Sequence, residues 1–440
     1  MTSLNDLILQ QTIQSRVGEP GKVVRIGRTT VSPLAEFRSL AEQVGGQPVE
    51  LVTVTNGIPG HFGLRGRDSH TVVFHLRQVE ICAFLYGLTV ETRLEESLLE
   101  DAFEGAVLRL IAEFLLQRGH GDQGIATLAR SRVVQGGLFL SGPPLGYLES
   151  MKRDERYLIE WFFALGHEIG HHLAPELAAT LNGLDCFEEG FIRQVVDVVL
   201  DGGFDTAAAY RLREIIECGD TGAAGRSHAS TQVLREEAVA DLFAVVCMSE
   251  AWNKLCADQA GRAYSPQVLL LEAMVSMSSV MTIEQCRIMA GWFSDMSYEV
   301  ENQPLMLSGV ALQTRMNLMH IALRDREVHA LLAARYPSFA PMTQLDVAAF
   351  DTAMRNLAAR SLSLSRPFAR AREFLSAPEM RDPGVVRAYL EDVAADPTTA
   401  NDATDFLRVA GHLRSPMLDT LRDVVDGGEP PLIYATGPSG

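Results

Sequence analysis

The spacing of apolar and polar residues divides the chain into a short mixed N-terminal part and a long helical part. Helical periodicity before residue 150 predicts helices within 1–20, at 33–43 and at 97–117. Alternating, β-branched stretches predict four strands: Lys22–Val31, Pro48–Thr55, Ser69–Arg77 and Arg132–Leu140. The turn residues of NGIPGHFGLRGRD separate the second strand from the third. This order predicts a small mixed sheet with helices around it.

From Asp154 onward the pattern is helical almost throughout. The first helix of this part contains LGHEIGHHLAP (residues 165–175), and apolar residues surround it on nearly all sides, so we expect it to be buried. Asp154 can cap its start, and Pro175 ends it. Further helices are predicted at 188–200, 206–217, 231–254, 266–296, 304–334, 344–376, 384–395, 402–413 and 416–425. We therefore expect a mostly helical α+β protein, with a small sheet before the LGHEIGHHLAP helix and a large helical C-terminal half.

Two glycines stand in the middle of the predicted strand Arg132–Leu140 (RVVQGGLFL). Glycine in a strand lets another backbone approach closely, and peptides commonly bind as an added strand at a sheet edge. The segment is therefore either a bulged structural strand or an edge that binds a peptide substrate, and the sequence leaves both open.

Composition and charge restrict the partners of the protein. The 440 residues carry a net charge of −18, and 47% of them are hydrophobic, as in an ordinary globular protein. Binding to nucleic acid or to an anionic membrane requires clustered lysine and arginine. The acidic balance therefore argues against both partners.

The sequence also favours a cytoplasmic protein. Its six cysteines form no C-x-x-C pair, which excludes a zinc ribbon and a redox motif and fits a reducing compartment. The N-terminal residues lack the basic and apolar regions of a secretion signal. No apolar stretch is long enough to predict a transmembrane helix.

Three residues of LGHEIGHHLAP have the order H-E-x-x-H: His167, Glu168 and His171. On a helix, residues four apart share a face, so both imidazoles can bind one metal ion. Glu168 lies about 100° round the helix from His167, which places its carboxylate beside the open position of the metal, where it can deprotonate a water. Two imidazoles, one carboxylate and an open fourth position suit Zn2+.

A catalytic zinc site needs a third ligand, and the best candidate lies in REEAVADLFAV. There Glu237 and Asp241 are four apart on one face of an apolar helix, and buried carboxylates need a compensating charge or hydrogen bonds. Zinc can supply the charge for Glu237, and a histidine N–H can supply the bond for Asp241. Glu236 is an alternative ligand. Three glutamates at shorter spacing from the motif are further alternatives: Glu176, Glu188 and Glu189.

The H-E-x-x-H motif followed by Glu237-x-x-x-Asp241 resembles the gluzincin pattern of thermolysin-like zinc metallopeptidases. The resemblance implies a zincin-like catalytic core in which His167, His171 and Glu237 bind zinc. It also implies that Glu168 is the general base and that Asp241 orients a zinc-binding histidine. It covers only these two helices and the order of sheet, motif helix and helical half.

Amide hydrolysis also needs a donor that stabilises the oxyanion, for which His320 and Arg315 of LQTRMNLMHIAL and Tyr157 are candidates. The predicted function is a zinc-dependent metallopeptidase that acts on a protein or peptide. The alternative is a zinc-binding regulatory or scaffold protein that does not cleave. We expect an N-terminal α/β region over residues 1–150, a zinc-binding catalytic region over 151–340 and a helical region over 341–440.

Overall fold

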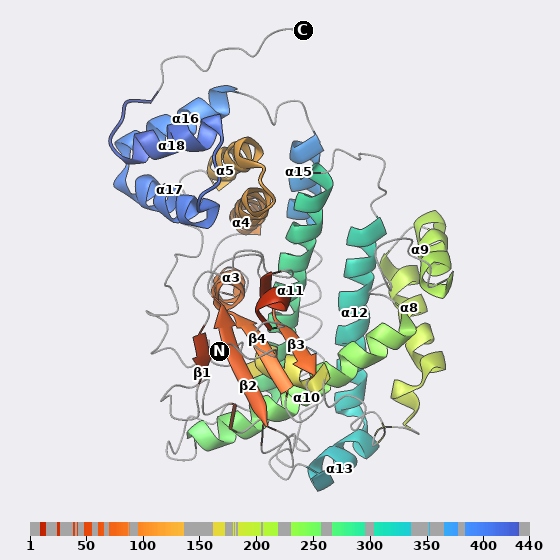
Figure 1. Cartoon of the computed structure of the whole chain (residues 1–440). Helices are drawn as coiled ribbons and strands as arrows, with labels where there is room; N and C mark the ends of the chain where they lie inside the picture. The colour runs from red at the N-terminus through yellow and green to blue at the C-terminus, as the bar shows by residue number, and fades with distance from the viewer. Residues whose placement is uncertain are drawn as a thin grey trace.

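The fold is taken from a computed structural model of the chain. The residues that it describes are 9–14, 24–26, 38–39, 42, 48–54, 60–65, 70–86, 88, 96–135, 162–171, 179, 181, 184–203, 206–218, 230–256, 266–294, 303–335, 352, 365–376 and 383–430. Among them the protein is mostly helical and contains one small mixed sheet, as the sequence predicts (Figure 1).

Among the described residues the sheet has the strand order β1-β2-β4-β3, which places β1 and β3 at its edges. The central strands β2 (Val49–Val54) and β4 (His70–His75) pair in parallel, and both confirm strands predicted from alternation. The edge strands β1 (Val24–Ile26) and β3 (Phe62–Arg65) pair antiparallel to them. The sequence did not predict β3, which lies in the segment read as a turn.

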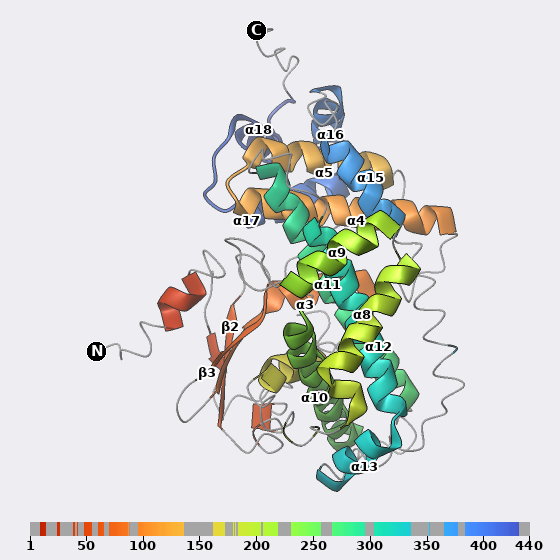
Figure 2. The ribbon, with the colours of Figure 1, turned by 90° about the vertical axis from the view of Figure 1, so that its right-hand side faces the viewer.

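Each face of the sheet packs against a different part of the chain. One face, which carries Leu51 and Phe74, joins a core with the helix at residues 162–171, called the motif helix below. The other face, which carries Val73 and Phe62, packs on Leu9 and Ile13 near the N-terminus. Figure 2 shows the sheet on one side of the motif helix (yellow) and α10 on the other.

The described helices mostly agree with the predicted ones. They are α3 (Leu76–Tyr86), α4 (Glu96–Gln117), α5 (Gly121–Gln135), α8 (Glu189–Gly203), α9 (Thr206–Cys218), α10 (Thr231–Cys256), α11 (Pro266–Ser294), α12 (Gln303–Arg324), α13 (Arg326–Arg335), α15 (Ser365–Ser376), α16 (Pro383–Ala395), α17 (Pro397–Ala410) and α18 (Pro416–Val425), with a 3-10 turn η2 (Asp185–Phe187). The sequence did not predict α3 and α5. Asp154, Tyr157, Pro175 and Glu176 lie outside the described residues.

The predicted strand Arg132–Leu140 is wrong for its first four residues, which end α5; the remaining five lie outside the described residues. α5 packs along α4, and the side chain of Ser131 donates a hydrogen bond of 2.8 Å to the backbone oxygen of Gly105. A Cβ on Gly105 would clash with the side chain of Gln135, so glycine at this position allows α5 to pack close to α4. This packing overrides the strand preference of the two valines that lie between Ser131 and Gln135.

Other element boundaries also differ from the predictions; the helix predicted at 402–413, for example, is α17 at Pro397–Ala410. The strand predicted to reach Arg77 ends at His75, where α3 begins. The single helix predicted over residues 304–334 is two helices that meet at Asp325. The carboxylate of Asp325 accepts a hydrogen bond of 2.7 Å from the backbone N–H of Glu327, so it caps α13 and separates it from α12.

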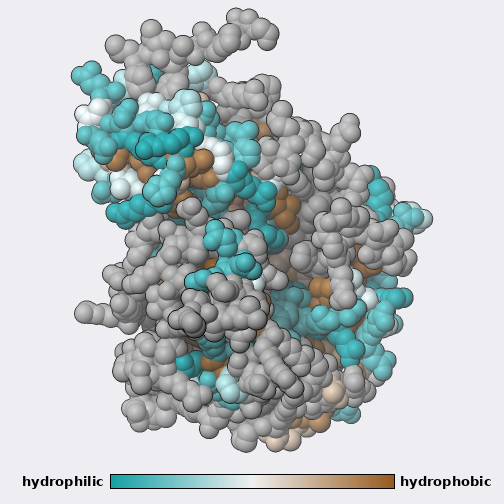
Figure 3. Space-filling view, viewed as in Figure 1, coloured by the Kyte–Doolittle hydropathy of each residue, from teal (hydrophilic) through white to brown (hydrophobic). Residues whose placement is uncertain are grey.

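The C-terminal helices α16–α18 pack against α4 and α5 through a core of their own. A chain of buried ion pairs joins the two groups: Arg77 to Glu113, Glu113 to Arg109, and Arg109 to Asp402 at 2.7 Å. Hydrophilic residues cover much of the described surface of these helices (Figure 3, upper left). The division into three domains stays a prediction. The helices of the predicted C-terminal region, α16–α18, pack on α4 and α5, which belong to the predicted N-terminal region.

No helix among the described residues is both long and apolar enough to cross a membrane. Four of the cysteines are buried with free thiols: Cys82, Cys186, Cys247 and Cys286.

Candidate metal centre

The motif helix crosses α10 at a seam of small residues. A Cβ on Gly170 would lie 2.8 Å from the Cα of Ala240, and one on Gly166 would lie 2.9 Å from the Cα of Ala244. Both glycines and both alanines repeat at a spacing of four, so they form one stripe on each helix. This close approach brings the H-E-x-x-H residues next to the carboxylates of α10.

The three sequence-predicted ligands meet at this crossing. Each of His167, His171 and Glu237 offers one ligand atom, and these atoms all lie within 4.8 Å of one another. The two Nε2 atoms are 3.0 Å apart. Oε2 of Glu237 lies 3.4 Å from Nε2 of His167, and Oε1 of Glu237 lies 3.5 Å from Nε2 of His171.

These separations fit a tetrahedral ion. With ligand bonds of about 2.0–2.2 Å and tetrahedral angles, neighbouring ligand atoms lie roughly 3.3–3.6 Å apart. Each nitrogen-to-oxygen separation falls in this range, but each involves a different oxygen of Glu237, so binding through one oxygen requires a rotation of the carboxylate. The nitrogen-to-nitrogen separation of 3.0 Å is slightly shorter than the range. The three residues could therefore hold a metal ion, and the donor set of two imidazoles and one carboxylate is one that zinc accepts.

Asp241 orients one of the histidines from behind. Its Oδ1 accepts a hydrogen bond of 2.8 Å from Nδ1 of His167, which leaves Nε2 of that ring facing the other ligands. The side chain of Asp241 is fully buried, whereas His167 is 13% exposed and His171 is 31% exposed. The site therefore opens to solvent on the side of His171.

Arg315 of α12 completes this arrangement. Its Nε and Nη2 donate to the two oxygens of Asp241 at 2.9 and 2.7 Å, and its Nη1 lies 3.0 Å from Oε2 of Glu237. A planar guanidinium matches a carboxylate in this two-bond geometry, so Arg315 fixes the orientation of Asp241. It thereby links a third helix to both carboxylates of α10.

The electrostatics follow from burial and from these pairs. Burial opposes the charge of Asp241 and of Glu237, but the Arg315 guanidinium lowers the pKa of both carboxyls, so both are ionised. Burial also opposes a charge on His167, yet the hydrogen bond and the charge of Asp241, then those of Glu237, raise its pKa to about 10. Burial and the charge of His167 lower the pKa of His171 to about 4.

A proton and a metal ion are therefore alternatives at this site. With both ring nitrogens protonated, His167 can donate to Asp241 and to Nε2 of His171 at the same time. A metal ion that binds the two Nε2 atoms has to displace the proton on Nε2 of His167. Glu168 is half-buried, and its charge contributes to raising the pKa of Arg315, so its carboxylate lies near the group.

The alternative ligands lie elsewhere. Glu236 is exposed and accepts a hydrogen bond of 3.1 Å from Gln232. Glu188 and Glu189 are exposed near the start of α8, away from the group that could hold a metal. Among the described glutamates, Glu237 alone combines with the two histidines to form such a group.

His320, a predicted oxyanion donor, is half-buried on α12, the helix that carries Arg315. His320 is five positions after Arg315, which places it about 140° round the helix from Arg315. The structure thus brings Arg315 to both carboxylates, and the role of His320 stays a prediction.

A histidine that the sequence analysis missed lies beside the site. His61 directly precedes β3, stacks on the ring of Phe74 at 4.4 Å, and accepts a hydrogen bond of 3.0 Å at Nδ1 from the backbone N–H of His75. Burial, followed by the charges of His75 and of His167, lowers its pKa to about 3. The alternation of HFGLR was the signal for this strand, but the surrounding turn residues concealed it.

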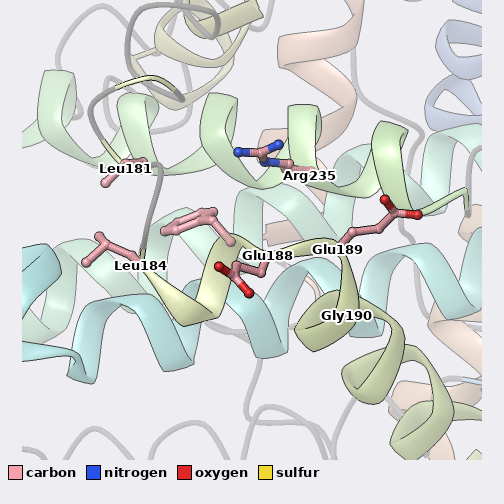
Figure 4. A pocket seen from close by; sticks show the side chains of 7 residues that line it. Leu181, Leu184, Glu188, Glu189, Gly190 and Arg235 are labelled. Carbon is pink, nitrogen blue, oxygen red and sulfur yellow. The ribbon is translucent and has the colours of Figure 1, made fainter.

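A separate open pocket of about 390 Å³ lies between α10 and the start of α8 (Figure 4). Arg235 extends toward it from α10, and Glu188 lies across from it. Arg235 is about 200° round α10 from Glu237, so the pocket opens on another face of that helix. The residues that line it are Leu181, Leu184, Phe187, Glu188, Glu189, Gly190 and Arg235.

No protein-family model, no curated protein and no solved structure matches this chain.

Proposed function

We propose that the protein is a zinc-dependent metallopeptidase with a zincin-like core, which hydrolyses peptide bonds in a protein or peptide. The observation that carries the proposal is the convergence of His167, His171 and Glu237, from two helices, at separations that suit one tetrahedral ion. In this proposal Glu168 is the general base, and Asp241 and Arg315 position the ligands.

The charges around the centre support a divalent cation. Glu168, Glu237 and Asp241 supply three negative charges, whereas Arg315 supplies one positive charge. A divalent ion would bring this group to neutrality, which favours its binding in a partly buried site. The raised pKa of His167 reflects the same excess of negative charge.

The proposed chemistry assigns a task to each side chain. Zinc, when bound, lowers the pKa of water and polarises the carbonyl group of the peptide bond. Glu168 accepts a proton from the attacking water as the new C–O bond forms. The same carboxyl group then donates this proton to the amide nitrogen as the C–N bond breaks. Asp241 keeps the hydrogen on Nδ1 of His167, so that Nε2 stays available as a ligand.

The sheet offers a place for the substrate. β3 is an edge strand, and it lies on the side of the sheet toward α12 in Figure 1. An extended peptide can add to such an edge through backbone hydrogen bonds. The segment that follows His61 would then hold the peptide beside the metal centre.

The test is a comparison of the wild type with Glu168→Gln, both loaded with zinc. Metal content is measured by elemental analysis, and activity is measured on a library of internally quenched peptides. We expect both proteins to bind one equivalent of zinc and only the wild type to cleave. Zinc binding by the wild type without cleavage would favour the scaffold alternative instead.

The ligand set needs its own control. His167→Ala and Glu237→Ala should each lose tightly bound zinc, whereas Glu236→Gln should keep it, because Glu236 is exposed and outside the group. Full zinc content in both alanine variants would show that the ligand set is wrong. Full cleavage by Glu168→Gln would show that the general base is wrong.

A further inference from the structure

The register of β3 puts His61 on the face of the sheet that packs in one core with the motif helix. Phe62 pairs with Val73, so His61 lies opposite Phe74, and the stacked rings show that the two side chains share one face. Phe74 belongs to the core that includes the motif helix. Phe62, one residue further on, packs on the opposite face with Leu9, as alternation requires.

Two further contacts fix the state of the ring. Nδ1 of His61 accepts the backbone N–H of His75, so Nδ1 carries no hydrogen. A neutral imidazole with an unprotonated Nδ1 has its hydrogen on Nε2. Stacking on Phe74 at an interplanar angle of 8° holds the plane of the ring. Among the described residues, the hydrogen bond that the structure gives for this ring is the one at Nδ1.

The ring lies on the side of the sheet that carries the proposed ligand His167, because Phe74, on which it stacks, packs in one core with the motif helix. The charge of His167 contributes to lowering the pKa of His61, in agreement with this placement. His61 lies outside the group whose ligand atoms meet within 4.8 Å, so it is a neighbour of the centre and not one of its ligands. It therefore presents a fixed N–H donor at the border between the edge strand and the metal centre.

We propose that His61 is a further catalytic residue, whose Nε2–H donates a hydrogen bond to the carbonyl oxygen of the peptide bond being cleaved. This inference rests on the proposed peptidase function. The carbonyl oxygen gains negative charge as water adds to the carbon, so a donor held in place beforehand stabilises the transition state more than the substrate. The backbone and the stacked ring hold this donor before substrate binds.

Two substitutions distinguish the effect of the N–H donor from the effect of the stacked ring. His61→Phe keeps a flat ring for stacking on Phe74 but has no donor. His61→Gln places an amide N–H the same number of bonds from Cβ as Nε2, but without the stack. We expect His61→Phe to lower kcat by about 10²- to 10³-fold with little change in KM, as loss of one oxyanion donor does elsewhere. We expect His61→Gln to recover part of kcat, which a purely structural role of the ring would not allow.

The activity assay uses one peptide from the quenched library that the wild type cleaves, and zinc content is measured in parallel. A second measurement avoids activity altogether. In the metal-free protein, ¹⁵N–¹H NMR of the histidine rings should show the hydrogen of His61 on Nε2. In the zinc-loaded protein, a phosphinic peptide, which mimics the tetrahedral geometry, should bind more weakly to His61→Phe by a factor similar to the loss in kcat.

Failure of this inference differs from failure of the proposed function. If the wild type cleaves, Glu168→Gln does not, and His61→Phe keeps full kcat, the proposed peptidase function is supported and the role of His61 is refuted. A hydrogen on Nδ1 of His61 would refute it in the same way. A wild type that binds zinc but cleaves nothing overturns the proposed function, and with it the role of His61.

Discussion

Replacing Gly170 by alanine should weaken metal binding, because this glycine sets the distance between the motif helix and α10. Its added Cβ would lie 2.8 Å from Cα and 2.9 Å from the carbonyl oxygen of Ala240. Both obstructing atoms are backbone, so no rotamer change can relieve the contact. Gly170 directly precedes His171, so a movement of the helix here displaces a proposed ligand.

The size of the effect follows from these distances. Ordinary contact begins at 3.4 Å, which leaves a shortfall of 0.6 Å for the helices to absorb. Metal sites tolerate deviations of only about 0.2 Å in ligand distance. Overpacking costs about 1–3 kcal/mol, and a metal ion that draws the helices together must restore this strain. Metal affinity should therefore fall roughly 5- to 150-fold.

The effect on folding stability should be smaller. In the metal-free protein the two helices can move apart and relieve part of the overpacking, and alanine is favoured over glycine in a helix by about 0.5–1 kcal/mol, which offsets part of the rest. Zinc affinity is measured by competition with a chelating dye at fixed pH, and stability by urea unfolding without metal. The expected result is a clear loss of affinity with a loss of stability of at most about 2 kcal/mol.

Gly309→Ala is the matched control, because Gly309 lies in α12 and its Cβ would meet nothing within 4 Å. It should leave zinc affinity unchanged and stabilise the protein by about 0.5–1 kcal/mol. Ala240→Gly should not rescue Gly170→Ala, because removing a Cβ leaves the obstructing backbone in place. Wild-type zinc affinity in Gly170→Ala would refute the idea that close packing of these helices positions the ligands.

Three further outcomes are expected. Asp241→Asn should weaken zinc binding about 10- to 100-fold, because His167 loses the carboxylate that orients it. In the metal-free protein, protonated His167 should stabilise the fold below its unfolded pKa of 6.5, and this contribution should disappear as pH rises through about 10. The difference in unfolding free energy between the wild type and His167→Gln, measured at several pH values, should decrease over this window. Asp402→Ala should destabilise the fold by about 1–3 kcal/mol in thermal or urea unfolding, because the buried Arg109 loses its partner in α17 and keeps Glu113.

Each of these outcomes has a control or a contradicting result. Glu236→Gln should keep wild-type affinity, and equal losses in it and in Asp241→Asn would point to a general effect of charge. A pH-independent difference between the wild type and His167→Gln would contradict the raised pKa of His167. Glu391→Ala removes an exposed ion pair with Arg387 and should change stability by less than about 1 kcal/mol. A similarly small effect of Asp402→Ala would show that the buried pair contributes little.

The helical half of the fold was readable because amphipathic periodicity acts over many residues. The predicted helix at 231–254 appears as α10 (Thr231–Cys256), and the one at 206–217 appears as α9 (Thr206–Cys218). Short elements were less readable. β3 has four residues between turn-forming segments, and its pairing with β4 decides its conformation. The end of α5 is helical because it packs on α4 across Gly105, a contact that no local pattern reveals.

The proposed ligands were readable from spacing, since a helix puts residues four apart on one face. That rule groups His167 with His171 and Glu237 with Asp241, and the structure brings the two pairs together. No sequence pattern ranks Arg315 above His320, because the choice depends on which side of α12 faces α10. No pattern singles out His61 either, because its position follows from strand register.

By itself, then, the sequence determined the chemistry that is available: two imidazoles, three carboxylates and the helices that carry them. Local spacing decides which of these groups share a helix face, because helix geometry repeats identically along a chain. The tertiary structure decided which groups meet, through the Gly170 and Ala240 contact that sets the approach of two helices. It also placed His61 on the face of the sheet that packs on the motif helix. Both depend on contacts between segments far apart in the chain, and no periodicity within either segment records them.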